Sequence, residues 1–332
     1  DVPARFLAQD ALAAEAPRLA SPSAVVEAEI GIPSVAEAAA LAAAGPAGEL
    51  VVAKQKSRRC TVAVALAPAP IEPLTIGRAQ GRLTVLGVGP GDAGTRTPAV
   101  SDALRRADLV IGYGLYLDLV ADLIGNAECR RYPLGEERER CIAAIEAAAA
   151  GRDVALVCSG DPGIYAMAAL VMEVLAKTTD PAAERIEIVV LPGVSALQVA
   201  AARAGAPLGH DFAVVSLSDL LTPMAVIEQR LRAAAEGGFA LALYNPVSQR
   251  RRTALATARA ILLEHRPAET PVIIARNLGR EAEAVTTTTL EVLAVDQVDM
   301  LSIVLIGSSQ SRSFTRVDGS TKTYTPRGYS VE

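Results

Sequence analysis

The loop Gly87-Val88-Gly89-Pro90-Gly91-Asp92 constrains the fold more than any other segment of this chain. It follows the apolar run Leu83–Leu86 and precedes Thr97-Pro98, a pair suited to the cap and first turn of a helix. Glycines let the backbone turn sharply and approach a ligand closely. The segment therefore predicts a strand, a ligand-holding loop and a helix, the repeating element of an α/β sheet.

The same loop contains the dinucleotide pattern G-x-G-x-x-G at residues 89–94, but it lacks the context of that motif. A dinucleotide site needs a carboxylate about 20 residues later, at the end of the next strand. The next predicted strand, residues 108–111, runs into Gly112-Tyr113-Gly114 instead. In addition, Asp92 places a negative charge where a pyrophosphate would lie. These features argue against a nicotinamide or flavin dinucleotide.

Composition bounds the class of protein. A chain of 332 residues that is 51% hydrophobic predicts two or three globular domains. A net charge of −5, 3% aromatic residues and no Trp argue against a nucleic-acid surface. Two His and four scattered Cys give neither a metal site nor a disulfide framework. No apolar run approaches the roughly 20 residues that span a bilayer, so we expect a cytoplasmic protein without membrane association.

Two later loops repeat the Gly/Pro pattern at the ends of predicted strands. Ser159-Gly160-Asp161-Pro162 follows the strand at 154–157, and Pro192-Gly193-Val194-Ser195-Ala196 follows the strand at 188–191. In open α/β sheets, ligands bind at the carboxyl ends of the strands. We therefore expect the three loops to converge on one pocket.

The remaining pattern predicts an α/β protein with mainly parallel sheets and several units. The first unit has an Ala-rich helix and a hairpin, and the second half begins after a strand at 212–217. The predicted parts are a small N-terminal α/β unit at 1–66, a linker at 67–80, two α/β domains at 81–220 and 221–312, and a polar tail at 313–332.

Together, the three loops and Tyr244-Asn245-Pro246 resemble the tetrapyrrole (corrin and porphyrin) methyltransferases in order and spacing, over about residues 81 to 312. Residues 205–212 and 216–223 resemble the branch that methylates precorrin-3B at carbon 17 and contracts the macrocycle. Residues 31–40 and 51–57 resemble the C-terminal part of a small cobalamin-biosynthesis domain, which predicts a partial accessory domain at 1–66. The resemblance implies two α/β domains with a cofactor cleft between them.

The implied cofactor is S-adenosylmethionine, and the implied reaction converts precorrin-3B to precorrin-4 in cobalamin biosynthesis. Adenosylmethionine carries a sulfonium and an ammonium cation, which favours carboxylates such as Asp92 near the loops. The resemblance also implies a homodimer. The cofactor-binding residues that it implies are Gly89, Pro90, Gly91, Gly160, Asp161, Ile164, Tyr165, Ser195, Ala196, Tyr244, Asn245, Thr286 and Thr287.

Ring contraction requires deprotonation of a tertiary alcohol, so a general base is expected. The candidates are His210, Asp211, Asp92 and Asp219, of which His210 is favoured because its ordinary pKa lies nearest neutrality. The substrate is a polycarboxylate, which predicts cations along the binding trough. The candidate cations are Arg276, Arg203 and Arg250.

Three alternatives stay open at this point. The substrate can be cobalt-factor III, methylated at the same carbon, or another tetrapyrrole carbon can be methylated. The chain can instead be a carrier that passes corrinoid intermediates to another enzyme. An RNA or protein methyltransferase of the same fold is disfavoured by the net acidity and the few aromatic residues.

Overall fold

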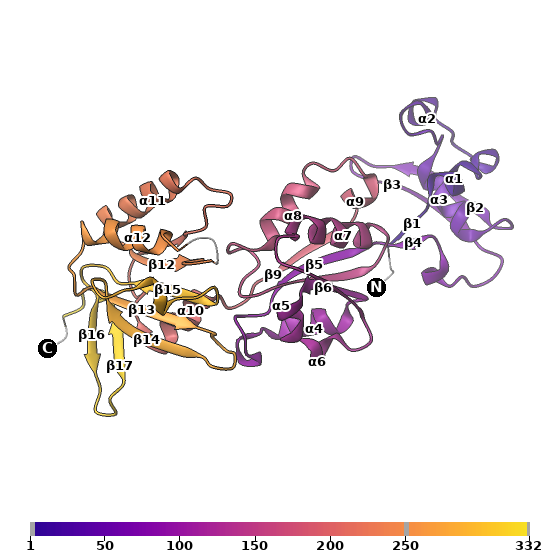
Figure 1. Ribbon diagram of the computed structural model, residues 1–332. Coiled ribbons are helices and arrows are strands. Elements are labelled where there is room, and N and C mark those ends of the chain that lie inside the picture. Colours follow the sequence, from indigo (N-terminus) through magenta and orange to yellow (C-terminus); the bar gives the residue numbers. More distant parts are fainter. Residues whose placement is uncertain (1–3, 249–251, 331–332) are drawn as a thin grey trace. The chain divides into compact units, whose positions relative to one another are not determined.

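The computed structural model describes residues 4–248 and 252–330 (Figure 1). Arg250, predicted to bind substrate, lies outside the described residues. The chain divides into two compact units. One comprises Asp1–Leu83, Ile142–Val154 and Leu175–Ile188, and the other Thr84–Cys141, Ala155–Val174 and Val189–Glu332. Within the described residues, no helix is long and apolar enough to cross a membrane.

The N-terminal segment contains the predicted helix and hairpin, as α3 and the antiparallel pair β2–β3. The predicted linker is partly ordered, because β4 pairs with β1. The elements of this segment are β1 (Arg5–Phe6), α1 (Gln9–Ala13), η1 (Ala16–Arg18), α2 (Ala24–Ile30), α3 (Val35–Ala44), β2 (Glu49–Lys56), β3 (Thr61–Leu66), η2 (Pro73–Thr75) and β4 (Arg78–Ala79).

A buried carboxylate organises this segment. Glu37 of α3 accepts backbone N–H groups from Ala20 at 3.0 Å, Ser21 at 2.9 Å and Lys54 at 2.7 Å. Burial alone raises the pKa of Glu37, but the hydrogen bonds from Lys54, Ser21 and Ala20 outweigh burial and hold it below its ordinary value. The carboxylate thereby ties α3 to the loop between η1 and α2 and to β2.

The first five-stranded sheet has the order β7-β6-β8-β5-β9. Its central strands are almost continuously buried, as expected for strands covered on both faces. The sequence missed β7, a mostly polar edge strand. The strands are β5 (Arg82–Gly87), β6 (Leu109–Tyr113), β7 (Glu128–Tyr132), β8 (Asp153–Cys158) and β9 (Glu187–Leu191); between them lie η3 (Ala93–Thr95), α4 (Pro98–Arg106), α5 (Gly114–Asp118), α6 (Ala121–Ile124), α7 (Glu137–Ala149), α8 (Met167–Leu175) and α9 (Pro181–Glu184).

The second five-stranded sheet has the order β11-β12-β15-β13-β14 and is mixed. Strands β11 and β12 are parallel, whereas β15 is antiparallel to both β12 and β13, and β14 is antiparallel to β13. The prediction of a mainly parallel sheet is therefore wrong for this half. Its elements are α10 (Ala196–Ala204), β10 (Gly205–Ala206), β11 (Phe212–Ser216), α11 (Met224–Glu236), β12 (Ala240–Tyr244), α12 (Ala254–Leu263), β13 (Pro271–Arg276), β14 (Ala284–Thr289), η4 (Val295–Gln297), β15 (Ser302–Ile306), β16 (Arg312–Thr315) and β17 (Thr321–Tyr324).

Strand β11 belongs to this second sheet and not to the first half, where the predicted boundary at residue 220 had put it. It pairs with β12 along its whole length, from Phe212 opposite Ala240 to Ser216 opposite Tyr244. The carboxyl ends of β11 and β12 therefore lie side by side. The parallel partner of β11 is β12, the next strand along the chain. The sequence alone does not show whether β11 pairs with this strand or with an earlier one.

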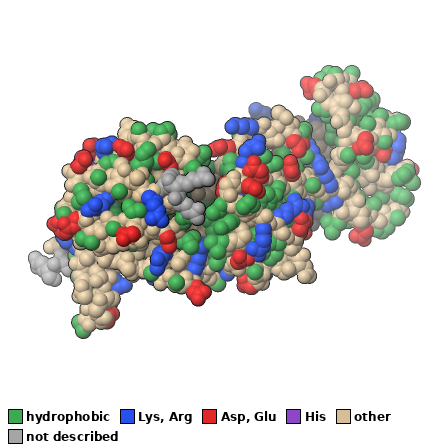
Figure 2. Space-filling model, in the orientation of Figure 1, with side chains coloured by type: hydrophobic (Ala, Val, Ile, Leu, Met, Phe, Trp, Pro, Cys, Tyr) green, Lys and Arg blue, Asp and Glu red, His purple; other side chains and the backbone are tan. Residues whose placement is uncertain are grey.

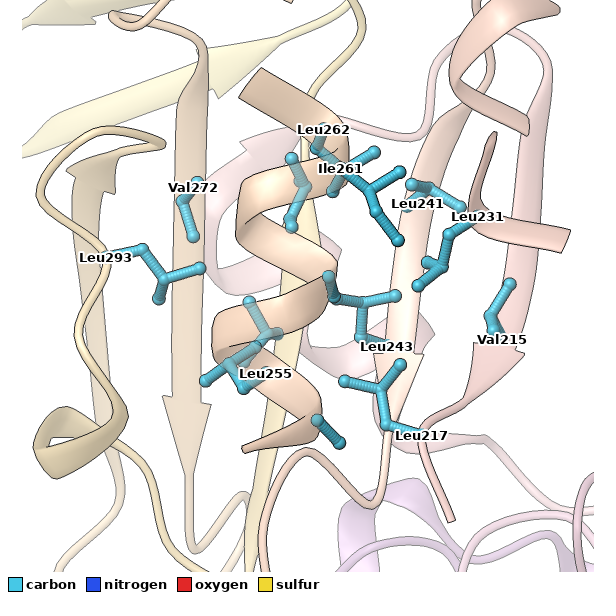
Figure 3. Packing of buried hydrophobic residues seen from close by; sticks show 14 of the residues in the cluster. Val215, Leu217, Leu231, Leu241, Leu243, Leu255, Ile261, Leu262, Val272 and Leu293 are labelled. Atoms are coloured by element: carbon cyan, nitrogen blue, oxygen red, sulfur yellow. The ribbon is translucent and has the colours of Figure 1, made fainter. Parts of the chain in front are cut away.

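Alternate residues of the second sheet face two different helix layers. Leu241 and Leu243 of β12 are buried with α11 and α12, as Figure 3 shows, while Ala242 is buried with α10. In Figure 3, Leu255 of α12 and Leu231 of α11 point toward this sheet. The sheet is thus sandwiched between helices, and its loops extend from its ends.

The predicted polar tail is folded in part. Strands β16 and β17 form an antiparallel hairpin, and β17 also pairs in parallel with β10. Its buried side chains are polar and bond to one another: Ser311 Oγ lies 2.7 Å from Thr325 Oγ1, and Ser313 Oγ lies 2.9 Å from Thr323 Oγ1. These pairs explain how a polar segment packs.

On the face drawn in Figure 2, acidic and basic side chains are interspersed.

Candidate functional site

The three Gly/Pro loops converge, as predicted. Gly160 donates its N–H to the Gly89 carbonyl at 2.8 Å, and Gly89 donates to the Gly160 carbonyl at 3.3 Å. A Cβ atom on Gly193 would lie 2.1 Å from the Gly160 carbonyl oxygen and 2.5 Å from that of Gly87. The backbones of the three loops are therefore in direct contact, with no room for side chains between them.

Two predicted cofactor residues hold these loops in place. Asp161 accepts the N–H of Gly163 at 2.8 Å within its own loop and the N–H of Gly193 at 3.1 Å in the next loop. Ser195 is buried and caps α10 through a capping box with Gln198. Both side chains are thus committed to positioning the loops. Of their neighbours, Ile164 is half-buried in the Asp161 loop, and Ala196 begins α10.

Tyr165 joins the Asp161 loop to the second sheet. Its hydroxyl donates to the Val214 carbonyl at 3.0 Å and accepts the N–H of Ser216 at 3.1 Å, so it occupies the open edge of β11. Its ring lies 5.5 Å from that of Tyr244, whose hydroxyl accepts the N–H of Leu197 at 3.4 Å. Burial raises the pKa of Tyr244. The loops of both sheets therefore meet at these two tyrosines.

A second junction involves the loop that follows β13. A Cβ on Gly91 would lie 2.5 Å from the carbonyl carbon and oxygen of Gly279. Glu283 accepts the N–H of Gly279 at 2.7 Å and forms an ion pair with Arg203 Nε at 2.7 Å. The Arg203 hydrogen bond, followed by that of Gly279, lowers the pKa of Glu283. Gly91 therefore packs against a loop that Glu283 holds in shape.

Backbone strain concentrates in the same loops. Among the described residues, four that are not glycine have a positive φ: Tyr165 (51°), Asn245 (51°), Asn277 (53°) and Ala282 (59°). All four lie in the loops described above or directly after β12. Such conformations cost free energy and cluster at functional sites. Asn245 also donates from Nδ2 to Ser216 Oγ at 3.0 Å.

Arg280 is a residue of this region that the sequence reasoning missed. Its Nε donates to the Pro90 carbonyl at 2.8 Å, its Nη2 lies 3.5 Å from Ser159 Oγ, and its guanidinium lies 6.0 Å from the ring centre of Tyr116. Burial lowers the pKa of Arg280. The available signal was its place after the carboxyl end of a strand, the same rule that selected Arg276.

The general-base candidates separate into two groups. His210 and Asp211 precede β11, whereas the loops meet the carboxyl end of that strand at Ser216. At about 3.3 Å per residue of an extended strand, Ser216 lies about 16 Å from Asp211. His210 is half exposed and accepts the N–H of Asp211 at 2.8 Å. The other two candidates share the edge of the loops. Asp92 follows β5 and caps η3, and Asp219 follows β11.

The remaining predicted residues are placed as follows. Arg276 ends β13 at the same edge, is exposed and lies 3.9 Å from Asp299. Arg203, near the end of α10, is paired with an acid, as described above. Thr286 and Thr287 lie inside β14, two and three positions along that strand from Ala284, which pairs with Arg276 at the edge. Among the described residues, no group of His, Cys, Asp and Glu is arranged to hold a metal ion.

Known families match two parts of the chain. Residues 82–294 match the family described as "Tetrapyrrole (Corrin/Porphyrin) Methylases", and residues 1–65 match "Cobalamin synthesis G C-terminus". The chain is 42% identical over 249 residues to a "Probable cobalt-factor III C(17)-methyltransferase" of Salmonella typhimurium, a match that covers 75% of this chain and 100% of that protein. It is 44% identical over 253 residues to a "Precorrin-3B C(17)-methyltransferase" of a Sinorhizobium species, covering 75% and 97%.

Solved structures agree in fold. The methyltransferase CobJ matches with a TM-score of 0.69 and 38% identity, over 74% of this chain and 100% of that one. A cobalt precorrin-4 methyltransferase matches with a TM-score of 0.56 and 23% identity, over 68% and 94%, which supports the fold alone. The family match, the full-length relatives and the joined loops together show that this chain belongs to the tetrapyrrole (corrin/porphyrin) methylases.

Proposed function

We propose that the chain transfers a methyl group from S-adenosylmethionine to carbon 17 of precorrin-3B or of cobalt-factor III, with contraction of the macrocycle. The proposal is supported by the names of relatives that match over nearly their whole length. The observation that carries it is the joining of three backbone loops of one sheet to the carboxyl ends of the other sheet's strands.

The loops fit this cofactor better than they fit a nucleotide phosphate. The contact surfaces are backbone, because Cβ atoms at Gly87 and Gly193 would collide with neighbouring carbonyls. The charged side chains of the loops, Asp92 and Asp161, are acidic, which suits a ligand with a sulfonium and an ammonium group. When bound, S-adenosylmethionine supplies an activated methyl group, so no nucleophilic side chain is required.

The main task of this chain is therefore to align the two reactants. Correct alignment supplies up to about 7–11 kcal/mol of the barrier. The mutual hydrogen bonds of Gly89 and Gly160, and the Tyr165 hydroxyl on β11, hold the loops of both sheets in one arrangement. We infer that this arrangement fixes where the methyl group lies and excludes water from the reacting atoms.

For ring contraction we infer that Asp92 or Asp219 takes the proton of the tertiary alcohol. Both lie at the carboxyl edge where the loops meet, whereas His210 and Asp211 lie at the amino end of β11. A base has to reach the proton within hydrogen-bond distance or through one water molecule. That requirement favours the two aspartates of the loop edge over the histidine.

The decisive experiment supplies methyl-labelled adenosylmethionine with precorrin-3B and, separately, with cobalt-factor III, and records product mass and carbon-13 spectra. A labelled methyl on carbon 17 of a contracted macrocycle supports the proposal and identifies the metal state of the substrate. The two relatives above are named for different substrates at 44% and 42% identity, so the assay has to include both.

A corrinoid carrier is the alternative from another class. It predicts binding of the tetrapyrrole without affinity for S-adenosylhomocysteine and without turnover. Calorimetric titration with S-adenosylhomocysteine separates the two proposals before any substrate is prepared. The homodimer and the cytoplasmic location stay predictions, and light scattering of the purified protein tests the first of them.

A further inference from the structure

Arg280 differs from Arg203 and Arg276, the two described arginines predicted to bind substrate, in having no acidic partner among the described residues. Arg203 is paired with Glu283 at 2.7 Å, and Arg276 lies 3.9 Å from Asp299. Within residues 4–248 and 252–330, no carboxylate forms an ion pair with Arg280. Its neighbours are the neutral Pro90 carbonyl, the Ser159 hydroxyl and the ring of Tyr116.

A half-buried cation without a counter-charge is unfavourable in the free protein. Burial lowers the pKa of Arg280, and the groups that oppose this shift are Tyr116 and Tyr113, which are uncharged near neutral pH. The fold nevertheless keeps the guanidinium where the loops of β5, β8 and β13 meet. An anionic ligand at this place would supply the missing charge.

The guanidinium also has hydrogen-bond donors to spare. Nε is used by Pro90, whereas the Nη2 contact with Ser159 is long at 3.5 Å. Nη1 has no hydrogen-bond partner in the described part of the chain. It is not fully buried, so a ligand can reach it. Arginine presents paired N–H groups that match the geometry of a carboxylate.

We propose that Arg280 binds a carboxylate of the ligand at this site and that it, rather than Arg276 or Arg203, is the principal anion-recognising cation there. The inference rests on the proposed function. Under that function the carboxylate has two sources, the methionyl group of the cofactor and the acetate or propionate side chains of the tetrapyrrole. Pro90 and Ser159 place Arg280 beside the loops predicted to hold the cofactor.

The test compares the wild type with R280Q and R280K. R280Q removes the charge and keeps an N–H donor, whereas R280K keeps the charge and loses the paired geometry. R232Q is the matched control, because Arg232 forms an exposed pair with Glu228 on α11, outside the loops. The measurements are dissociation constants for S-adenosylhomocysteine and methylthioadenosine, which lacks the carboxylate, and the KM for the tetrapyrrole substrate. Thermal unfolding confirms that each variant is folded.

If the cofactor supplies the carboxylate, R280Q binds S-adenosylhomocysteine about 10- to 100-fold more weakly and binds methylthioadenosine as the wild type does. If the substrate supplies it, cofactor affinity is unchanged and the substrate KM rises by a similar factor. In both cases R280K recovers part of the loss and R232Q shows none.

Equal weakening of both cofactor probes, or values within twofold of the wild type in every assay, would overturn the inference. Equal weakening would mean that Arg280 only shapes the Pro90 loop. A wild type that neither binds S-adenosylhomocysteine nor turns over substrate would instead contradict the proposed function itself.

Discussion

Replacing Gly193 by alanine tests whether contact between the loops determines the geometry of the site. The new Cβ would lie 2.1 Å from the Gly160 carbonyl oxygen, well inside the 3.4 Å at which ordinary contact begins. A second backbone oxygen, that of Gly87, lies at 2.5 Å, so no side-chain rotation relieves the collision. The loops have to separate by about 1 Å, and such overpacking costs about 1–3 kcal/mol of unfolding free energy.

This cost corresponds to a fall in Tm of about 2–12 °C for a domain of this size. A displacement of about 1 Å at a reacting centre lowers turnover by about 100-fold, so the kinetic effect should exceed the thermal one. Differential scanning calorimetry, titration with S-adenosylhomocysteine and the labelled-methyl assay measure the three effects on one protein sample.

The matched control is Gly114→Ala. Gly114 begins α5, and its added Cβ would lie 3.4 Å from Arg131 Nη1, an ordinary contact. This variant should lose neither Tm nor cofactor affinity, because alanine at a compatible position is neutral or slightly stabilising. The reasoning is refuted if Gly193→Ala matches the wild type in Tm and turnover, because the loops would then not be in contact.

Three further results are expected. Tyr165→Phe loses both hydrogen bonds to β11, so urea unfolding should show a loss of about 1 kcal/mol and cofactor affinity should fall; unchanged affinity would exclude a role in joining the sheets. Glu37→Gln should be less stable than the wild type above pH 4.5, and the difference should vanish as the pH falls through the lowered pKa of Glu37; a difference independent of pH in denaturant titrations would contradict this. Burial raises the pKa of Cys158 to about 11 and of Cys141 to about 12, so a thiol reagent at pH 8 should modify only the two exposed cysteines of the folded protein, and rapid reaction of all four would disprove this burial.

The convergence of the three loops, which the sequence predicted, is a property of the backbone. Gly87, Gly160 and Gly193 follow apolar strands, and the rule that ligands bind at the carboxyl ends of strands brings their loops together without knowledge of any side chain. The contacts agree with that expectation. Strand and loop signals are local, and a short window of sequence contains them.

The side chains were harder because their partners are distant in sequence. Arg280 reaches Pro90 across 190 positions, and no local pattern indicates that contact. The proposal of His210 as the general base stays a prediction, and the topology bears on it in a different way. His210 precedes its strand, and residues before a strand lie at the opposite edge of the sheet from residues that follow a parallel neighbour. The rule that selected the loops therefore also argued against the histidine.

The C-terminal hairpin was missed because hydropathy treats Ser and Thr as surface residues. Here Thr323 is fully buried, and its hydroxyl is satisfied by that of Ser313. Threonine is β-branched and favours strands, so the run Thr321–Tyr324 did contain a signal. Hydroxyl groups paired across two strands satisfy each other, and composition does not reveal that pairing.

The pairing of β17 with β10 also has a consequence for synthesis. Thr325 bonds to Pro207 across 118 positions of the chain, so the ribosome must add all of them before this contact exists. Contacts of such long range form late and slowly. Until then, β10 lacks the one strand that pairs with it in the described structure, and Ser311 and Ser313 lack their hydroxyl partners Thr325 and Thr323. A nascent chain that stalls before β17 would therefore lack the β10–β17 pairing. We expect proteases to degrade such a chain faster than the complete one.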